Sequence, residues 1–384
     1  MNDVLRTLRE ARPAELNPDA TVDADARRAE LARAMAADVD PATPGKAMRR
    51  RVRPMWGLGL AGAVAAGALV AATLVAPGGD EPGANRAGGG PGAEKTLDAK
   101  TVLLAAAEKA NGQTDTPRAY WHHVAIASHT YTVGKAGARY AIVTRDRQET
   151  WTPSEPGGKA WNGRQYLGAK PATAADAEAW RSAGSPGGFD VRVPISPGST
   201  ITKPFTVEVE PGPVEIRPST PAEGGKVFWL GRNVTMKDLR SLPSDAARLK
   251  AELMRWYEGH GTEGDVPARP GEWLYGVAQG LVMDMPVRPE VRAAAFRMLA
   301  GLPSVKSIGE VTDPEGRTGN AIAVDKETPR GVIRHRMIID LSIGTALASQ
   351  NIMLKPASGE EVPAGRAMNS VVTISAEWTD SPPR

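Results

Sequence analysis

The spacing of hydrophobic and polar residues changes several times along the chain, and each spacing predicts a different kind of element. Apolar residues at helical spacing predict a helix over 98–110. Two stretches rich in β-branched and aromatic residues, 120–133 and 139–151, flank a glycine-containing turn and predict a β-hairpin. The helical period returns at about 244–302, and strand patterns separated by turns follow from 304 onward.

These elements predict that residues 98–384 form an α+β domain. Its expected architecture is a curved antiparallel sheet packed against helices, with a helical insertion at about 244–302. Residues 153–225 are rich in Pro and Gly, and only strand fragments are expected there.

One apolar run predicts a membrane anchor before this domain. Residues 56–76 contain no charged residue and no proline. As a helix the run would be about 31 Å long, the thickness of a bilayer's hydrocarbon core. We therefore expect a single transmembrane helix at 55–76. The alternatives are a cleaved signal peptide, for which the preceding stretch is too long, and a buried core helix, which would normally have a polar face.

The charges around this run predict its orientation. A basic cluster precedes it directly: Lys46, Arg49, Arg50, Arg51 and Arg53. Positive charges favour the cytoplasmic side, so residues 1–54 are expected to be a cytoplasmic helical arm. Residues 77–97 form a Gly/Pro-rich linker, and the domain at 98–384 is expected outside the cytoplasm.

Composition and the distribution of charge exclude several kinds of binding site and partner. The chain has 47 Lys+Arg, 44 Asp+Glu and no cysteine, which excludes disulfides and thiolate metal sites. Because the excess positive charge sits in one cluster beside the apolar run, no nucleic-acid-binding face is expected. The expected partners are the membrane and an unidentified ligand or protein. Small residues also recur at every fourth position of the run, at Gly59, Ala63 and Gly67, and such a face would allow two helices to dimerise. The alternative is that this spacing arises by chance in so Ala-rich a segment.

The motifs of several enzyme classes are absent from the sequence. It contains no G-x-S-x-G, H-E-x-x-H, D-x-D-x-D-G or complete P-loop motif. His123 and His129 lie six residues apart on a predicted strand, about 20 Å, so a shared metal ion would require a bulge. We therefore expect no catalytic residues, no cofactor and no metal site.

Aromatic residues are concentrated in the first predicted strands. On a concave sheet, several of them would line an apolar pocket for a lipid-like or peptide ligand. The residues expected to do so are Trp121, Tyr140, Trp151 and Trp161. The alternative is that these rings fill the core between sheet and helices.

Short motifs along the chain carry a resemblance to a known family. They are 148–151 (QETW), Trp180 with 184–186 (GSP), 242–245 (LPSD), 302–305 (LPSV), 309–319 (GEVTDPEGRTG) and 338–344 (IIDLSIG). With the order of arm, anchor and spacer, they resemble an uncharacterised actinobacterial family of single-pass membrane-anchored proteins with an extracytoplasmic domain. This resemblance implies a fold and no functional residues. The plan is also similar to lipoprotein-carrier-like and sigma-regulator outer domains.

The sequence thus predicts a non-enzymatic, single-pass protein of the cell membrane. Its outer domain is expected to bind a ligand or partner, with signalling or regulation as one version of that role. Two alternatives stay open. The first is an anti-sigma-like regulator that acts through residues 1–54. The second is an extracytoplasmic hydrolase without a recognised motif.

Overall fold

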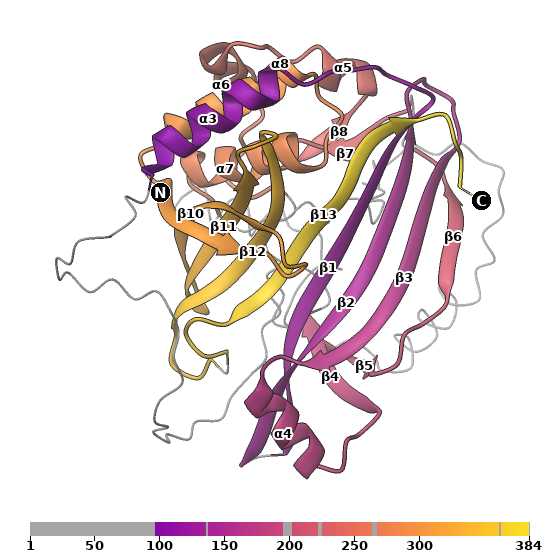
Figure 1. The fold of residues 1–384 in the computed structure, drawn as a ribbon, viewed down its shortest axis with the longest axis vertical. Helices are drawn as coiled ribbons and strands as arrows, with labels where there is room; N and C mark the ends of the chain where they lie inside the picture. The colour runs from indigo at the N-terminus through magenta and orange to yellow at the C-terminus, as the bar shows by residue number, and fades with distance from the viewer. Residues whose placement is uncertain are drawn as a thin grey trace, which may run out of the picture. The chain divides into compact units, whose positions relative to one another are not determined.

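The computed structural model describes residues 97–135, 137–194, 202–221, 225–262, 267–360 and 362–383, and nine antiparallel strands of this part form one sheet (Figure 1). The first strand of the sheet pairs with the second on one side and with the last on the other. From edge to edge the order is β6 (Val214–Ser219), β3 (Ala160–Pro171), β2 (Ala138–Pro153), β1 (Tyr120–Lys135), β13 (Ala367–Thr379), β12 (Thr345–Pro356), β11 (Gly331–Asp340), β10 (Thr318–Thr328) and β9 (Lys306–Thr312).

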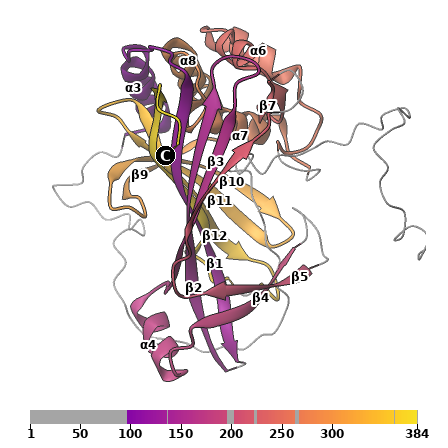
Figure 2. The same ribbon diagram turned by 90° about the vertical axis from the view of Figure 1, so that its right-hand side faces the viewer.

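Two small hairpins and six helices complete the described structure. The hairpins are β4 (Gly188–Pro194) with β5 (Thr202–Glu208), and β7 (Val227–Trp229) with β8 (Arg232–Val234). The helices are α3 (Ala99–Asn111), α4 (Ala174–Ser182), α5 (Met236–Arg240), α6 (Ala246–Met254), α7 (Pro270–Met283) and α8 (Pro289–Ala300). Figure 2 shows α3, α6 and α8 near one end of the long strands and α4 near the other.

Local sequence explains where these elements begin and turn. The Asp98 side chain accepts a hydrogen bond from the Thr101 amide at 2.9 Å and caps the start of α3. In the β1–β2 turn, Gly134 has φ +97°, and a Cβ there would lie 2.5 Å from the Ala138 carbonyl oxygen. Only glycine fits this position, so the glycine determines where the hairpin reverses.

Helices of the segment 236–300, together with α3, cover one face of the second half of the sheet, whereas α4 packs on β2 and β3. Helices α3, α6, α7 and α8 share a core with side chains of β10, β11 and β12, among them Ile322, Met337 and Ala346. The same face of β1, β2, β3 and β13 carries no residue of this core. The helical layer therefore leaves this part of the face to other elements.

A second, smaller core lies on the opposite face. The buried residues Ala321, Ile338 and Val372 belong to it, and Ile308 and Val311 of β9 pack against them. The β9–β10 turn is fastened to β12 by Arg317, whose Nη2 donates to the Leu347 carbonyl at 3.1 Å.

The two outermost strands of the sheet differ from the inner ones. β6 exposes Glu215, Arg217 and Pro218. In β9, Ile308 is an additional residue between two paired positions, and the following Gly309 has φ +90°. One edge is therefore charged and interrupted by proline, and the other carries a β-bulge.

The α+β fold class predicted from the sequence is wrong. The structure is mainly β: one large antiparallel sheet of nine strands, with few helices. The physical reason is the pairing of β1 with β13, which joins the predicted N-terminal hairpin and the C-terminal strands into one sheet. The Pro/Gly-rich segment contributes further strands, β3 to β6.

The predicted fold class also placed a transmembrane helix before the domain. In the part of the chain that the structure describes, no helix is long and apolar enough to cross a membrane. The predicted helix at 55–76 lies outside the described residues, as do the arm at 1–54, the basic cluster, the small-residue face and all of the linker except Leu97.

We expect Val372→Ala to destabilise the domain by about 2 kcal/mol, because the change deletes two buried methyl groups and leaves a cavity. Val372 is 0% exposed beside the β1–β13 pairing. Ile374, two residues along the same strand and 40% exposed, provides the control. In urea unfolding, Ile374→Ala should lower the free energy of unfolding by less than half as much as Val372→Ala. Equal decreases would contradict the conclusion that the core around Val372 stabilises the sheet.

Candidate ligand pocket

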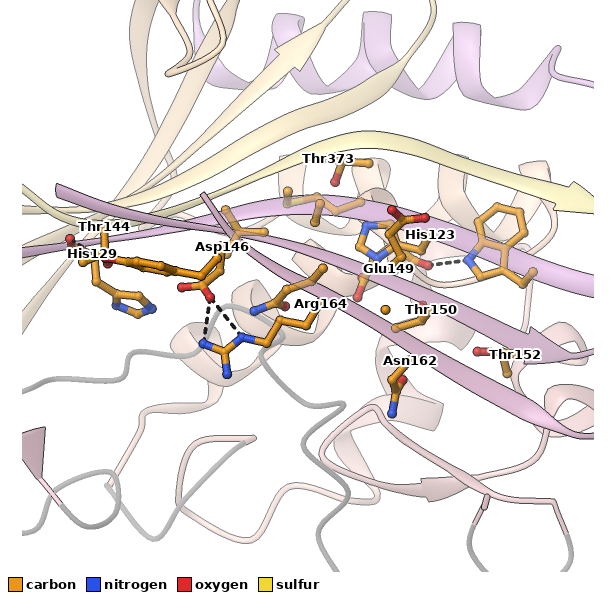
Figure 3. A pocket seen from close by; sticks show the side chains of 18 of the residues that line it. His123, His129, Thr144, Asp146, Glu149, Thr150, Thr152, Asn162, Arg164 and Thr373 are labelled. Atoms are coloured by element: carbon orange, nitrogen blue, oxygen red, sulfur yellow. Dashed lines mark hydrogen bonds and ion pairs between the residues drawn. The ribbon is translucent and has the colours of Figure 1, made fainter. Parts of the chain in front are cut away.

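A cavity of about 330 Å³ lies on the part of the sheet face that the helices leave uncovered (Figure 3). Side chains of β1, β2, β3 and β13 form its floor. Its walls come from Phe205 of β5, Trp229 of β7, and Met283 and Asp284 at the end of α7. We call this cavity the sheet pocket.

The register of the strands brings polar side chains together on the floor. Alternate residues of a strand point to the same face, and directly paired residues share that face. His123 pairs with Thr150, which pairs with Asn162, and Gln148 pairs with Arg164. The polar residues that line the pocket are His123, His129, Thr144, Asp146, Gln148, Glu149, Thr150, Thr152, Asn162, Arg164 and Thr373.

Aromatic rings stand around this polar floor. They are Trp121, Tyr131, Tyr166, Phe205 and Trp229. Trp121 is buried, and its indole Nε1 donates a hydrogen bond to the Asp284 carbonyl at 2.7 Å. This bond connects the end of α7 to β1 and thus determines the position of one pocket wall.

Contacts with Trp378, and through it with Asp115 and Arg240, hold the Trp121 ring in place. Its ring meets the edge of Trp378 at 5.2 Å between centroids. The Trp378 Nε1 donates to the Asp115 carboxylate at 3.1 Å, and Arg240 also binds this carboxylate. The Arg240 guanidinium lies 5.4 Å from the Trp378 ring centroid. The indole that lines the pocket is therefore held by β13, α5 and the segment after α3.

One ion pair balances the charge of the floor. Arg164 donates to Oδ1 of Asp146 from Nε at 3.0 Å and from Nη2 at 2.7 Å. His129 also lines this end of the pocket. Burial lowers the pKa of His129, and the Asp146 carboxylate opposes the shift. The charges of Asp146 and Arg164 cancel and the His129 imidazole is neutral, so this end of the pocket has little net charge.

Three polar atoms of the pocket lining are enclosed and lack a hydrogen-bond partner among the described residues. They are His123 Nε2, Asp284 Oδ1 and Thr373 Oγ1. Burial, with a smaller effect of the neighbouring His122, lowers the pKa of His123 to about 4. Burial also raises the pKa of the Asp284 carboxyl to about 7. Buried polar groups in native proteins are normally paired, so three at one cavity form an unusual cluster.

The structure separates the four aromatic residues that the sequence singled out. Trp121 lines the sheet pocket. Tyr140 lies farther along the same face, in an apolar cluster where its ring meets Phe189 at 6.1 Å. Trp151 pairs with Trp161 and with His122, and the Trp151 ring stacks on His122 at 4.4 Å between centroids. The alternation along β1 and β2 places these two tryptophans on the opposite face of the sheet.

The sequence reasoning missed the polar residues of the floor. A signal for them exists in β2, where residues 144–150 read TRDRQET and are polar at both alternating sets of positions. A strand inside a sheet with one face on the core would alternate polar and apolar residues. No comparable signal marks Asp284 or Thr373, because only tertiary structure brings them to the pocket.

The described residues contain no group of three or more His, Asp or Glu side chains that could hold a metal ion. Comparison with known protein families, curated proteins and solved structures finds no match for the chain. The family resemblance read from the sequence motifs therefore stays a prediction.

The raised pKa of Asp284 predicts a pH-dependent effect of Asp284→Asn on stability. The unfolded carboxyl ionises near pH 4 and the folded one near pH 7, so the buried carboxylate destabilises wild type increasingly as the pH rises between these values. Asn keeps the shape without the charge. Urea unfolding should show the variant more stable by up to about 4 kcal/mol at pH 8, with the pH-dependent difference falling below about 1 kcal/mol at pH 4.

Two buried histidines have lowered pKa values, so their effect on stability changes with pH in the opposite sense to that of Asp284. They are present in wild type and in Asp284→Asn. The pKa values of His123 and His335 are lowered to about 4, so each contributes stability at neutral pH that is lost as the pH falls from 6.5 through 4. Because wild type and variant share these histidines, their effect cancels in the comparison. A stability difference of equal size at pH 4 and pH 8 would contradict an ionising, buried Asp284.

Proposed function

We propose that residues 97–383 form a non-enzymatic binding domain whose sheet pocket holds one small polar molecule. The observation that carries this proposal is the arrangement of the pocket: aromatic rings stand around a floor of hydrogen-bonding side chains. Rings provide apolar surface for a ligand, and a few oriented polar groups determine its position.

The size and charge of the pocket support a small, uncharged ligand. A volume of about 330 Å³ lies at the lower end of the range of small-molecule sites, about 300–1,000 Å³. The Asp146–Arg164 pair compensates its own charge. The lining is too polar for an acyl chain, because buried polar groups would be left against hydrocarbon.

Binding rather than catalysis is favoured by how the polar groups are held. Arg164 engages Asp146 through two guanidinium nitrogens, and the Thr144 hydroxyl points to the His129 carbonyl at 3.4 Å. Neither contact activates a nucleophile, which requires an adjacent general base. The sheet provides a rigid floor, which suits recognition of a ligand in one orientation.

Thermal unfolding with a panel of probe compounds tests this proposal. We expect glucose or triglycine, which are polar and carry no net charge, to raise the melting temperature by about 5 °C when present at 100 times its dissociation constant. Decanoate, an acyl-chain anion, and spermidine, a polycation, should leave the melting temperature unchanged. Thr150→Phe should abolish this increase, because its ring would fill the middle of the floor. Chemical analysis of the bound probe should show it unchanged, and turnover would favour the hydrolase alternative instead.

The matched control is Thr132→Phe, the same substitution on the opposite face of β1, as the strand alternation places it. It should leave the temperature increase intact. The proposal is wrong if no probe stabilises the wild-type domain, or if both variants respond to the probes equally.

A further inference from the structure

Two of the residues with unpartnered atoms, His123 and Thr373, are neighbours in the sheet, and the third, Asp284, lies at the end of α7 beside Trp121. His123 follows Trp121 by two residues on the same face of β1, and Trp121 is hydrogen-bonded to the Asp284 backbone. Thr373 pairs directly with Ala125, the next pocket-lining residue of β1 after His123. Figure 3 shows His123 and Thr373 in the same part of the pocket. We call Asp284, His123 and Thr373 the inner polar site.

The three side chains of this site provide both hydrogen-bond donors and hydrogen-bond acceptors. The threonine hydroxyl donates and accepts, the neutral imidazole nitrogen does one or the other according to its tautomer, and the carboxyl oxygen accepts or, when protonated, donates. A ligand hydroxyl also donates and accepts, so it can match each of the three atoms in any of these states. An alkyl chain would leave all three unpaired.

Charge argues against an ionic ligand at the same place. The enclosed carboxyl of Asp284 would repel an anion. The lining has no further unpaired carboxylate for a cation, because Arg164 holds Asp146 and Arg147 holds Glu149. With burial shifting the pKa of His123 to about 4 and of Asp284 to about 7, the imidazole is neutral and the carboxyl is about half ionised at neutral pH. An uncharged ligand has the smallest free-energy cost of desolvation when it moves from water into such a site.

Resting on the proposed binding function, we infer that the inner polar site selects an uncharged ring compound with adjacent hydroxyl groups, such as a sugar or a cyclitol. The hydroxyls bind Asp284, His123 and Thr373, and the less polar ring face lies against the aromatic wall that includes Trp121 and Trp229. Sugars and cyclitols combine these two surfaces in one small molecule.

Thr373→Val tests the inference, because it removes the hydroxyl and keeps the shape of the side chain. Isothermal titration calorimetry with glucose, maltose and myo-inositol should show binding to the wild-type protein, weakened about 10-fold or more in the variant. The unfolding midpoint of the variant should not fall, because Val removes an unsatisfied buried hydroxyl. A purely structural role would lower stability and affinity together.

Ser307→Ala is the matched control. The Ser307 hydroxyl is also enclosed and lacks a partner among the described groups, but it lies on β9 and does not line the pocket. This variant should bind the three probes as wild type does. Among the probes, glucose and maltose report sugar recognition, whereas binding of myo-inositol alone identifies a cyclitol site.

The outcomes separate this inference from the proposed function. Triglycine binding that Thr150→Phe abolishes, without binding of any hydroxylated probe, would overturn the inference and leave the proposed function standing. Binding of the hydroxylated probes that Thr373→Val does not weaken would also overturn it. If no probe of any class binds, both proposals fail.

Discussion

The structure depends above all on the pairing of the first strand of the sheet with the last. β1 and β13 pair from Tyr120 with Thr379 to His129 with Asn369, although they lie near opposite ends of the described chain. Without this pairing, β1 to β3 with β6 and β9 to β13 would be two separate sheets, each with an additional open edge. Closing so long a loop costs chain entropy, so the seam must be supported by extensive burial on both faces. Such non-local pairing also slows folding.

The sheet pocket follows from unequal cover on this one large sheet. The helical layer buries the apolar face of β10, β11 and β12, whereas the corresponding face of β1 to β3 carries polar residues that no helix covers. The Trp121 bond to Asp284 marks where the helical layer ends. The pocket thus lies between two packed regions of one face, the helical core at one side and the apolar cluster around Tyr140 at the other.

Sequence reasoning succeeded where the deciding contacts are local. The helix expected over 98–110 and the hairpin over 120–133 and 139–151 are confirmed as α3 and β1–β2, because capping, periodicity and turn glycines act over a few residues. The fold class failed because the pairing of β1 with β13 leaves no local mark in the sequence. The hairpin register alone would have separated two of the predicted aromatic residues: Trp121 pairs with Thr152, so Trp151 faces the other way. The polar strand β2 was the overlooked signal for the pocket floor.

The two edge strands have a consequence for the behaviour of the protein in concentrated solution. An open sheet presents a row of unpaired backbone groups at each end, and another chain can add a strand there and start aggregation. On β6, Pro218 lacks an amide donor, and Glu215 and Arg217 would have to be matched by an incoming strand. On β9, the bulge at Ile308 and Gly309 twists the edge away from the flat geometry that stacking requires. Both edges therefore oppose the addition of a further strand by another chain.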